Sequence, residues 1–199
     1  MGVVFKFDIE KAVAATVYVA SRKPKPIELT QAKLFKMMYL ADKDHLVRYG
    51  RPITGDLYSA MEHGPVPSNL YNAFKEMSKR QAARNENAKI LAKGIRLDTT
   101  YRYPRIEPLA EVDPLQLSVS DTKSLERVVK QFGKMTFSQV RQIAHDTPAW
   151  EIAWNGKPEG KDAAPMKFED FFEDDANALS GVKEEMLENH TLKMAFARR

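Results

Sequence analysis

The chain has 199 residues, of which 43% are hydrophobic, a formal net charge of +4 and no cysteine. The length allows one large domain or two small ones with a real apolar core, and the lack of cysteine excludes disulfides, thiolate metal sites and cysteine nucleophiles. The first ten residues carry three charged side chains, and no apolar run approaches the roughly 20 residues of a membrane span. We therefore expect a cytoplasmic protein that does not associate with a membrane.

The charge is unevenly distributed along the chain. Residues 1–105 hold an excess of nine positive charges, and residues 159–188 hold an excess of seven negative charges. Such an asymmetry can steer a charged partner toward the protein, and it can equally reflect two ordinary solvated faces. The sequence leaves both interpretations open.

Capping residues and hydrophobic spacing predict two helices in the first 50 residues. The first covers residues 9–22 with Asp8 as its N-cap, and the second covers residues 31–49 between Thr30 and Gly50. The apolar arc of the second helix is wide, which is typical of a helix buried by several neighbours. That arc holds Leu34, Phe35, Met37, Met38, Tyr39, Ala41, His45, Leu46 and Tyr49, and the remaining strip holds Lys33, Lys36, Lys43 and Asp44.

The pattern changes after the second helix. A third helix is predicted for residues 69–92, with Ser68 as its cap and a basic second half. Between residues 94 and 109 the apolar spacing approaches two, which predicts a small strand pair that Pro104 and Pro108 restrict to an edge. The apolar positions there are Ile95, Leu97, Tyr101, Tyr103 and Ile106.

The last 80 residues add further helices. A fourth helix is predicted to follow Ser120 and to end at Gly133, and a fifth covers residues 137–145, with Thr136 and Gln139 at capping-box spacing. Residues 166–175 read as a short acidic helix or turn, and residues 180–197 as a last helix. The fold class is therefore mainly α, a compact multi-helix domain with a small β-hairpin or minor sheet.

The usual signatures of catalysis are absent from the sequence. There is no Walker A loop, dinucleotide glycine fingerprint or nucleophile elbow, and no two of the four histidines pair as H-x-x-x-H for a helical zinc site. The dipeptide Glu62-His63 is compatible with acid–base chemistry but has little specificity alone. We predict no enzyme, with no catalytic residue, metal or cofactor.

Nucleic-acid binding is a separate hypothesis. The basic residues Lys75, Lys79, Arg80, Arg84, Lys89 and Lys93 lie along the predicted 75–96 helix, together with Arg96, and could track phosphates. Tyr101 and Tyr103 follow and could stack on bases. No recognition-helix motif accompanies them, and the acidic last third argues against a wholly basic binder.

The segment from residue 29 to residue 71 carries the most informative motifs. They are Lys33-Leu34, Met38-Tyr39-Leu40-Ala41-Asp42, Tyr49-Gly50-Arg51-Pro52, and Gly64-Pro65-Val66 followed by Tyr71. This pattern resembles the core signature of the Panacea-domain antitoxins, also known as SocA-like or GepA-like. His145 and Trp150 resemble a later histidine-to-tryptophan segment of the family, and Met38 departs from the usual leucine, which a flexible thioether can replace. The resemblance covers roughly residues 7–175.

The resemblance implies an antitoxin that acts by binding and not by chemistry. Members of the family are paired with unrelated toxins and usually neutralise them in a direct complex, so a cognate protein toxin is the expected partner. One member instead delivers its toxin to the ClpXP protease, which makes a proteolytic adaptor the alternative, and a nucleic-acid-binding regulator ranks third. We assign residues 1–175 to the Panacea domain and residues 176–199 to a C-terminal helix that packs on it. The sequence does not indicate an oligomeric state.

The motif residues are the candidates for structure or for partner contact. They are Tyr39, Asp42, His45, Tyr49, His63, Gly64, Pro65, Val66, Asn69 and Tyr71. The motif is first a folding signature, and we expect partner contact, if any, at Asp42, His63 and the loop of residues 64–69. His45 is either a buried neutral histidine or a ligand or proton shuttle, and the two tryptophans, Trp150 and Trp154, are either core anchors or a binding platform.

Overall fold

The computed structural model describes residues 2–79, 85–173 and 175–196. The elements follow in the order α1 (Ile9–Arg22), α2 (Gln31–Tyr49), β1 (Tyr58–Met61), β2 (Gly64–Pro67), α3 (Ser68–Met77), α4 (Glu86–Gly94), β3 (Ile95–Asp98), β4 (Arg105–Pro108), α5 (Val119–Phe132), α6 (Phe137–His145), α7 (Pro148–Asn155), β5 (Ala163–Pro165), η1 (Phe168–Phe172) and α8 (Val182–Phe196). The predicted class, mainly α with minor sheets, is confirmed.

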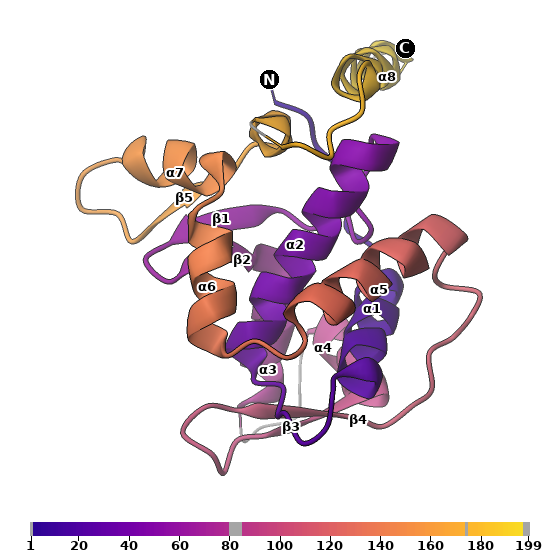
Figure 1. Cartoon of the computed structure of the whole chain (residues 1–199), viewed down its shortest axis with the longest axis vertical. Coiled ribbons are helices and arrows are strands. Elements are labelled where there is room, and N and C mark those ends of the chain that lie inside the picture. The colour runs from indigo at the N-terminus through magenta and orange to yellow at the C-terminus, as the bar shows by residue number, and fades with distance from the viewer. Residues whose placement is uncertain (1, 80–84, 174, 197–199) are drawn as a thin grey trace.

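Helix α2 runs through the middle of the molecule, with α1, α5, α6 and the β1–β2 hairpin around it (Figure 1). The predicted burial of its apolar arc is confirmed except at Tyr49, which is exposed, and three lysines of the remaining strip are buried as well. Each of these ammonium groups has an internal acceptor. Lys33 Nζ donates to Gly133 O at 2.8 Å, Lys36 Nζ donates to Pro65 O at 2.8 Å, and Lys43 pairs with Asp175. Internal acceptors therefore let α2 bury charged residues along with its apolar ones.

The first two helices begin and end as predicted. Asp8 accepts a hydrogen bond from Lys11 N, and Thr30 accepts one from Lys33 N, so both side chains cap their helices. Gly50 has a φ of 70°, which ends α2 in the left-handed conformation that glycine adopts without strain.

The predicted helix over residues 69–92 is wrong, because α3 ends at Met77 and α4 begins at Glu86. Phe74 and Leu91 are both fully buried. A continuous helix would hold these two residues about 25 Å apart, whereas two helices that pack on each other place both in one core. Tertiary packing therefore overrides a helix-favouring sequence here.

Ser68 is not the cap of α3 but its first residue, and its hydroxyl lies 3.0 Å from Ser59 Oγ. The capping role belongs to Asp56, whose carboxylate accepts hydrogen bonds from Asn69 N at 2.9 Å and Leu70 N at 2.8 Å. Asp56 is buried, and its contact ties the segment before β1 to α3.

Two small antiparallel sheets accompany the helices. The predicted strand pair is confirmed as β3–β4, with Ile95 opposite Pro108, but Tyr101 and Tyr103 lie in the loop between the strands and not on them. The second sheet has the order β2-β1-β5. Its third strand, β5, was not expected from the sequence.

The C-terminal half agrees with the prediction apart from β5 and one helix. Ser118 and Asp121 form the capping box of α5, so the helix starts two residues before the predicted point after Ser120. Thr136 and Gln139 form the predicted box of α6, and the acidic turn is the 3-10 helix η1. Helix α7, with Pro148 in its first turn, was not predicted. Helix α8 lies at the end of the molecule beyond the last turn of α2 (Figure 1).

Candidate functional site

Asp42 is a fully buried carboxylate at the centre of the family-like motif. Its Oδ1 accepts hydrogen bonds from Ile53 N at 2.9 Å and Thr54 N at 3.0 Å, and its Oδ2 accepts from Tyr58 OH at 2.8 Å and Thr54 Oγ1 at 2.5 Å. Burial raises the pKa of Asp42 to about 6 against the opposing effect of these donors. The carboxylate therefore holds the turn after α2 against the helix, which is a structural role.

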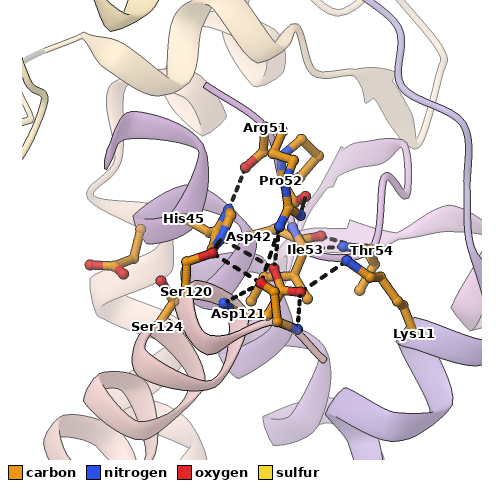
Figure 2. Close-up of polar contacts among 12 residues, drawn as sticks. Lys11, Asp42, His45, Arg51, Pro52, Ile53, Thr54, Ser120, Asp121 and Ser124 are labelled. Atoms are coloured by element: carbon orange, nitrogen blue, oxygen red, sulfur yellow. Dashed lines mark hydrogen bonds and ion pairs between the residues drawn. The ribbon is translucent and has the colours of Figure 1, made fainter. Parts of the chain in front are cut away.

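A second buried carboxylate, Asp121, lies beside two cations, Lys11 and Arg51, and beside the His45 ring (Figure 2). Its Oδ2 accepts from Lys11 Nζ at 2.9 Å, and its Oδ1 lies 2.9 Å from Arg51 Nη2 and 3.1 Å from His45 Nε2. The contacts of Oδ1 are close enough for ion pairing but are not aligned as hydrogen bonds. Burial raises the pKa of Asp121, but hydrogen bonds from Lys11 and Ser118 outweigh it and lower the pKa overall.

His45 lies inside the cluster and is fully buried. Its Nδ1 is 2.6 Å from Arg51 O, so Nδ1 must carry a proton, and its Nε2 is 3.0 Å from Ser120 Oγ, which can donate to it (Figure 2). Burial lowers the pKa of His45. The arrangement is that of a buried, hydrogen-bonded histidine.

The other motif residues divide between the interior and the surface. Tyr39 is fully buried, with its hydroxyl 2.9 Å from Thr147 Oγ1, and Asn69 donates to Asp56. Tyr49 and Tyr71 are 46% and 37% exposed, and His63 is exposed in the β1–β2 turn. The surface members are the ones that a partner can reach.

A cavity of about 690 Å³ lies beside this turn. It is bounded by the first turn of α2, the β1–β2 hairpin, α3, the β3–β4 loop, α6 and the end of α7 with the following loop. The lining residues are Thr30, Ala32, Phe35, Lys36, Met61, Glu62, His63, Val66, Tyr71, Tyr103, Phe137, Trp154, Lys157, Lys161 and Asp162. The cavity thus brings together three of the predicted site residues, His63, Val66 and Tyr71.

Gly64 shapes the wall of this cavity. Its φ is 93°, and a Cβ at this position would lie 2.9 Å from His145 Cδ2 and 3.1 Å from Lys36 Cε. Only glycine permits both the backbone conformation and the close approach. Burial, with repulsion from Arg141 as a smaller cause, lowers the pKa of Lys36 to about 7.

The histidine and tryptophans behind the wall form one stack. The ring centroids of His145 and Trp150 are 3.7 Å apart, and those of Trp150 and Trp154 are 5.6 Å apart. Trp150 Nε1 donates to Met61 O at 3.0 Å, which fixes the stack to β1. Trp150 is buried, whereas Trp154 lines the cavity, so the pair combines a core anchor with a surface-facing ring.

The basic residues do not lie on one helix. Lys75 belongs to α3, Lys79 follows it, and Lys89 and Lys93 belong to α4; all four are exposed. Lys79 pairs with Glu76 and Lys89 pairs with Glu86, which neutralises part of the surface. Arg80 and Arg84 lie outside the described residues. A single phosphate-tracking helix is therefore not the arrangement found.

The described residues offer neither a metal-binding group nor a membrane-spanning helix. Within residues 2–79, 85–173 and 175–196, no group of three or more His, Cys, Asp or Glu side chains is placed to hold a metal ion. No helix in the same residues is long and apolar enough to cross a bilayer.

Comparison with known proteins gives two matches. The family described as "Antitoxin SocA-like, Panacea domain" matches residues 34–151, more than half of the chain. The protein "Antitoxin SocA" of Caulobacter vibrioides (strain NA1000 / CB15N) is 24% identical over 131 residues, which cover 65% of this chain and 62% of that protein. The chain thus spans less than two thirds of that relative. No solved structure matches.

Proposed function

Because the chain belongs to the SocA-like antitoxins of the Panacea-domain family, we propose that it is the antitoxin of a toxin–antitoxin system and neutralises a protein toxin in the cytoplasm by binding it directly. The family match over residues 34–151 carries this proposal. The matched segment includes α2, the β1–β2 hairpin and most of the cavity wall.

The surface around the cavity supports binding to a protein. Tyr71 and Tyr103 are 37% and 62% exposed beside it, and Ile152 on α7 is 50% exposed. Tyrosine and other large apolar side chains are enriched at protein interfaces, and exposed apolar side chains that cluster mark sites of interaction. A stable complex would bury about 1,600 Å² in total, so the contact must extend well beyond the cavity.

The proposal is tested by expressing each reading frame next to this gene in a bacterial host, with and without this chain. We expect one frame to arrest growth alone, to be harmless when this chain is made, and to purify with it as a complex. If no neighbouring frame is toxic, or if rescue occurs without a complex while the toxin persists, direct neutralisation is wrong.

The same experiment separates the alternative mechanism. For a proteolytic adaptor, the toxin would disappear in cells with a ClpXP-type protease and would persist, still toxic, in cells without it. For direct binding, neutralisation would not depend on the protease. A gel-shift on the promoter over a salt series tests the nucleic-acid-binding regulator, which the division of the basic residues between α3 and α4 disfavours.

A further inference from the structure

We propose that the cavity beside the β1–β2 turn binds an aromatic group that carries a negative charge, and that this group belongs to a segment of the partner protein. The assignment of this group to a partner protein rests on the proposed function, whereas its aromatic and anionic character does not.

The walls of the cavity favour an aromatic occupant. Five aromatic side chains from separate parts of the chain line it: Phe35, Tyr71, Tyr103, Phe137 and Trp154. The volume of about 690 Å³ falls within the roughly 300–1,000 Å³ that is usual for ligand pockets. Aromatic rings attract another ring in edge or offset-stacked geometry.

Several of these rings are held in place before any ligand arrives. Phe35 meets Tyr71 edge-on, with centroids 6.0 Å apart. Trp154 stacks on Trp150, which is itself fixed to β1 by its hydrogen bond to Met61 O. Because little side-chain freedom remains to be lost, binding costs less conformational entropy than at a flexible surface.

The inner part of the cavity holds Lys36, which is positively charged below its lowered pKa of about 7 and which a bound anion would favour in that form. Lys36 is 3% exposed, and its Nζ has one acceptor, Pro65 O, although an ammonium group can donate three hydrogen bonds. The acidic lining residues, Glu62 and Asp162, are exposed at the rim. An anionic group that enters the cavity would thus reach an ammonium with unused donors, and such a charge-assisted hydrogen bond is among the stronger ones.

The rim favours a protein over a free small molecule as the source of this group. Tyr103 and Tyr71 extend to the outer surface, and the two lysines Lys157 and Lys161 lie beside them in the lining. A small ligand would leave this rim in water, whereas a partner's surface would cover it and exclude water around the inserted group. An acidic segment with an aromatic side chain fits both parts of the site.

The chemistry is tested with two small probes that share one ring. Indoleacetate carries a carboxylate and tryptamine carries an ammonium on the same indole. Both are titrated into the isotope-labelled full chain by two-dimensional NMR. We expect indoleacetate to shift the amide signals of cavity residues such as Val66 and Phe137, and tryptamine to bind about fivefold more weakly or not at all, as for one modest ion pair. Equal binding of both probes, or no shift at the cavity, would overturn the proposal.

Three variants sharpen the titration. Lys36→Met keeps the length and apolar stem of the side chain and should remove the preference for indoleacetate, provided that the spectrum stays dispersed as in a folded protein. Tyr103→Ala should weaken indoleacetate binding, whereas Tyr101→Ala, in the same loop but outside the cavity lining, should not. Both tyrosines are exposed, so neither change threatens the fold. A preference that survives Lys36→Met in a folded variant would rule out this lysine as the anion contact.

The partner is tested in the growth assay of the proposed function. Tyr103→Ala should reduce neutralisation of the toxin, and Tyr101→Ala should leave it unchanged. If the probes bind the cavity but Tyr103→Ala neutralises as well as the unaltered chain, the site serves a free small ligand and the assignment to a partner is wrong. If no toxin exists, the proposed function fails, while the titration still decides the chemistry of the cavity.

Discussion

Among single side chains, Asp42 determines how the chain leaves α2. Its carboxylate is buried, has no cationic partner among the described residues, and is stabilised by two backbone N–H groups and two hydroxyls. A buried charge that is met only by neutral donors remains costly to ionise, which is why its pKa is raised to about 6. The residue contributes geometry, because it positions the turn from which the β1–β2 hairpin starts.

Replacing Asp42 separates the role of its shape from that of its charge. Asp42→Ala leaves four buried donors without an acceptor, and we expect it to lower the free energy of unfolding by about 3–5 kcal/mol. Asp42→Asn keeps an oxygen toward the N–H groups of Ile53 and Thr54, and its amide can donate to the two hydroxyls, so we expect a loss of about 1 kcal/mol. Urea unfolding measures both, and an equal loss in the two variants would contradict this account.

The raised pKa of Asp42 also predicts how the stability of the unaltered chain, compared with Asp42→Asn, depends on pH. Because the pKa of Asp42 is higher in the folded protein than its ordinary value, the folded state takes up the proton more readily, and the resulting stabilisation is present at low pH and lost as the pH rises through about 6. A shift of about two units corresponds to about 3 kcal/mol. The free energy of unfolding of the unaltered chain, relative to that of Asp42→Asn, should therefore increase as the pH falls from about 7 to about 4. A difference that stays constant over this range would show that the pKa of Asp42 is not raised.

At the scale of elements, helices with local caps were predictable and features that depend on distant residues were not. Asp8 and Thr30 cap α1 and α2 from positions next to them, so sequence alone placed both. The cap of α3 is Asp56, which lies 13 positions before Asn69, and no spacing rule indicates such a contact. The break between α3 and α4 is different, because Asn85 caps α4 locally by accepting a hydrogen bond from Asn87 N, a signal that the predicted continuous helix overlooked.

The candidate site was predictable only in part, because it too depends on residues that are distant in the sequence. The sequence pointed to the loop after Gly64 and to Tyr71, because both belong to the family-like motif. The opposite wall comes from Tyr103, Phe137 and Trp154, whose positions in the sequence show no common pattern. Tyr103 was considered as a base-stacking residue, and Trp154 as either a core anchor or part of a binding platform. Only the fold places them around one cavity.

The β1–β2 turn offers a matched test of close packing. Gly64→Ala combines a positive φ with contacts of 2.9 Å to His145 and 3.1 Å to Lys36, whereas Gly160→Ala has a φ of 74° and nothing within 4 Å of the added Cβ. We expect Gly160→Ala to cost about 1 kcal/mol for the backbone alone and Gly64→Ala about 3 kcal/mol. Urea unfolding of both variants provides the comparison. Similar losses of unfolding free energy would mean that His145 and Lys36 move away from the added methyl group at little cost.

Across the whole molecule, some of the charges that make the sequence asymmetric are paired or buried inside the fold. In the basic half, Lys11 pairs with Asp121, and Lys33 and Lys36 are buried against carbonyl groups. Lys43 pairs with Asp175, so one charge of the basic half holds one charge of the acidic segment. Whether the remaining charges steer a partner or only form solvated faces, they are fewer than the sequence suggested. The exposed acidic residues include Glu184, Glu185 and Glu188 on α8.

Among the side chains of α8 that the structure describes, one is buried and two large apolar ones are exposed. Met186 is 3% exposed, and Val182 lies against Gly50 at the end of α2. Leu187 and Leu192 are 38% and 56% exposed. The assignment of residues 176–199 to a C-terminal helix that packs on the domain stays a prediction. A further hypothesis is that this helix helps to select the toxin or packs a dimer. The two kinds of side chain allow stability and binding to be tested apart.

The double variant Leu187→Ser/Leu192→Ser removes the exposed apolar groups and leaves Met186 in place. We expect its free energy of unfolding to stay within about 0.5 kcal/mol of the unaltered chain, since surface changes of this kind cost little, while its neutralisation of the toxin falls. Met186→Ala is the control, because it should lose about 2 kcal/mol by opening a cavity under the helix yet keep the exposed face. Urea unfolding gives the first quantity, and the growth assay with size-exclusion chromatography gives the second together with the oligomeric state. Full neutralisation and an unchanged elution volume in the double variant would place the exposed face of α8 outside both the toxin contact and any dimer.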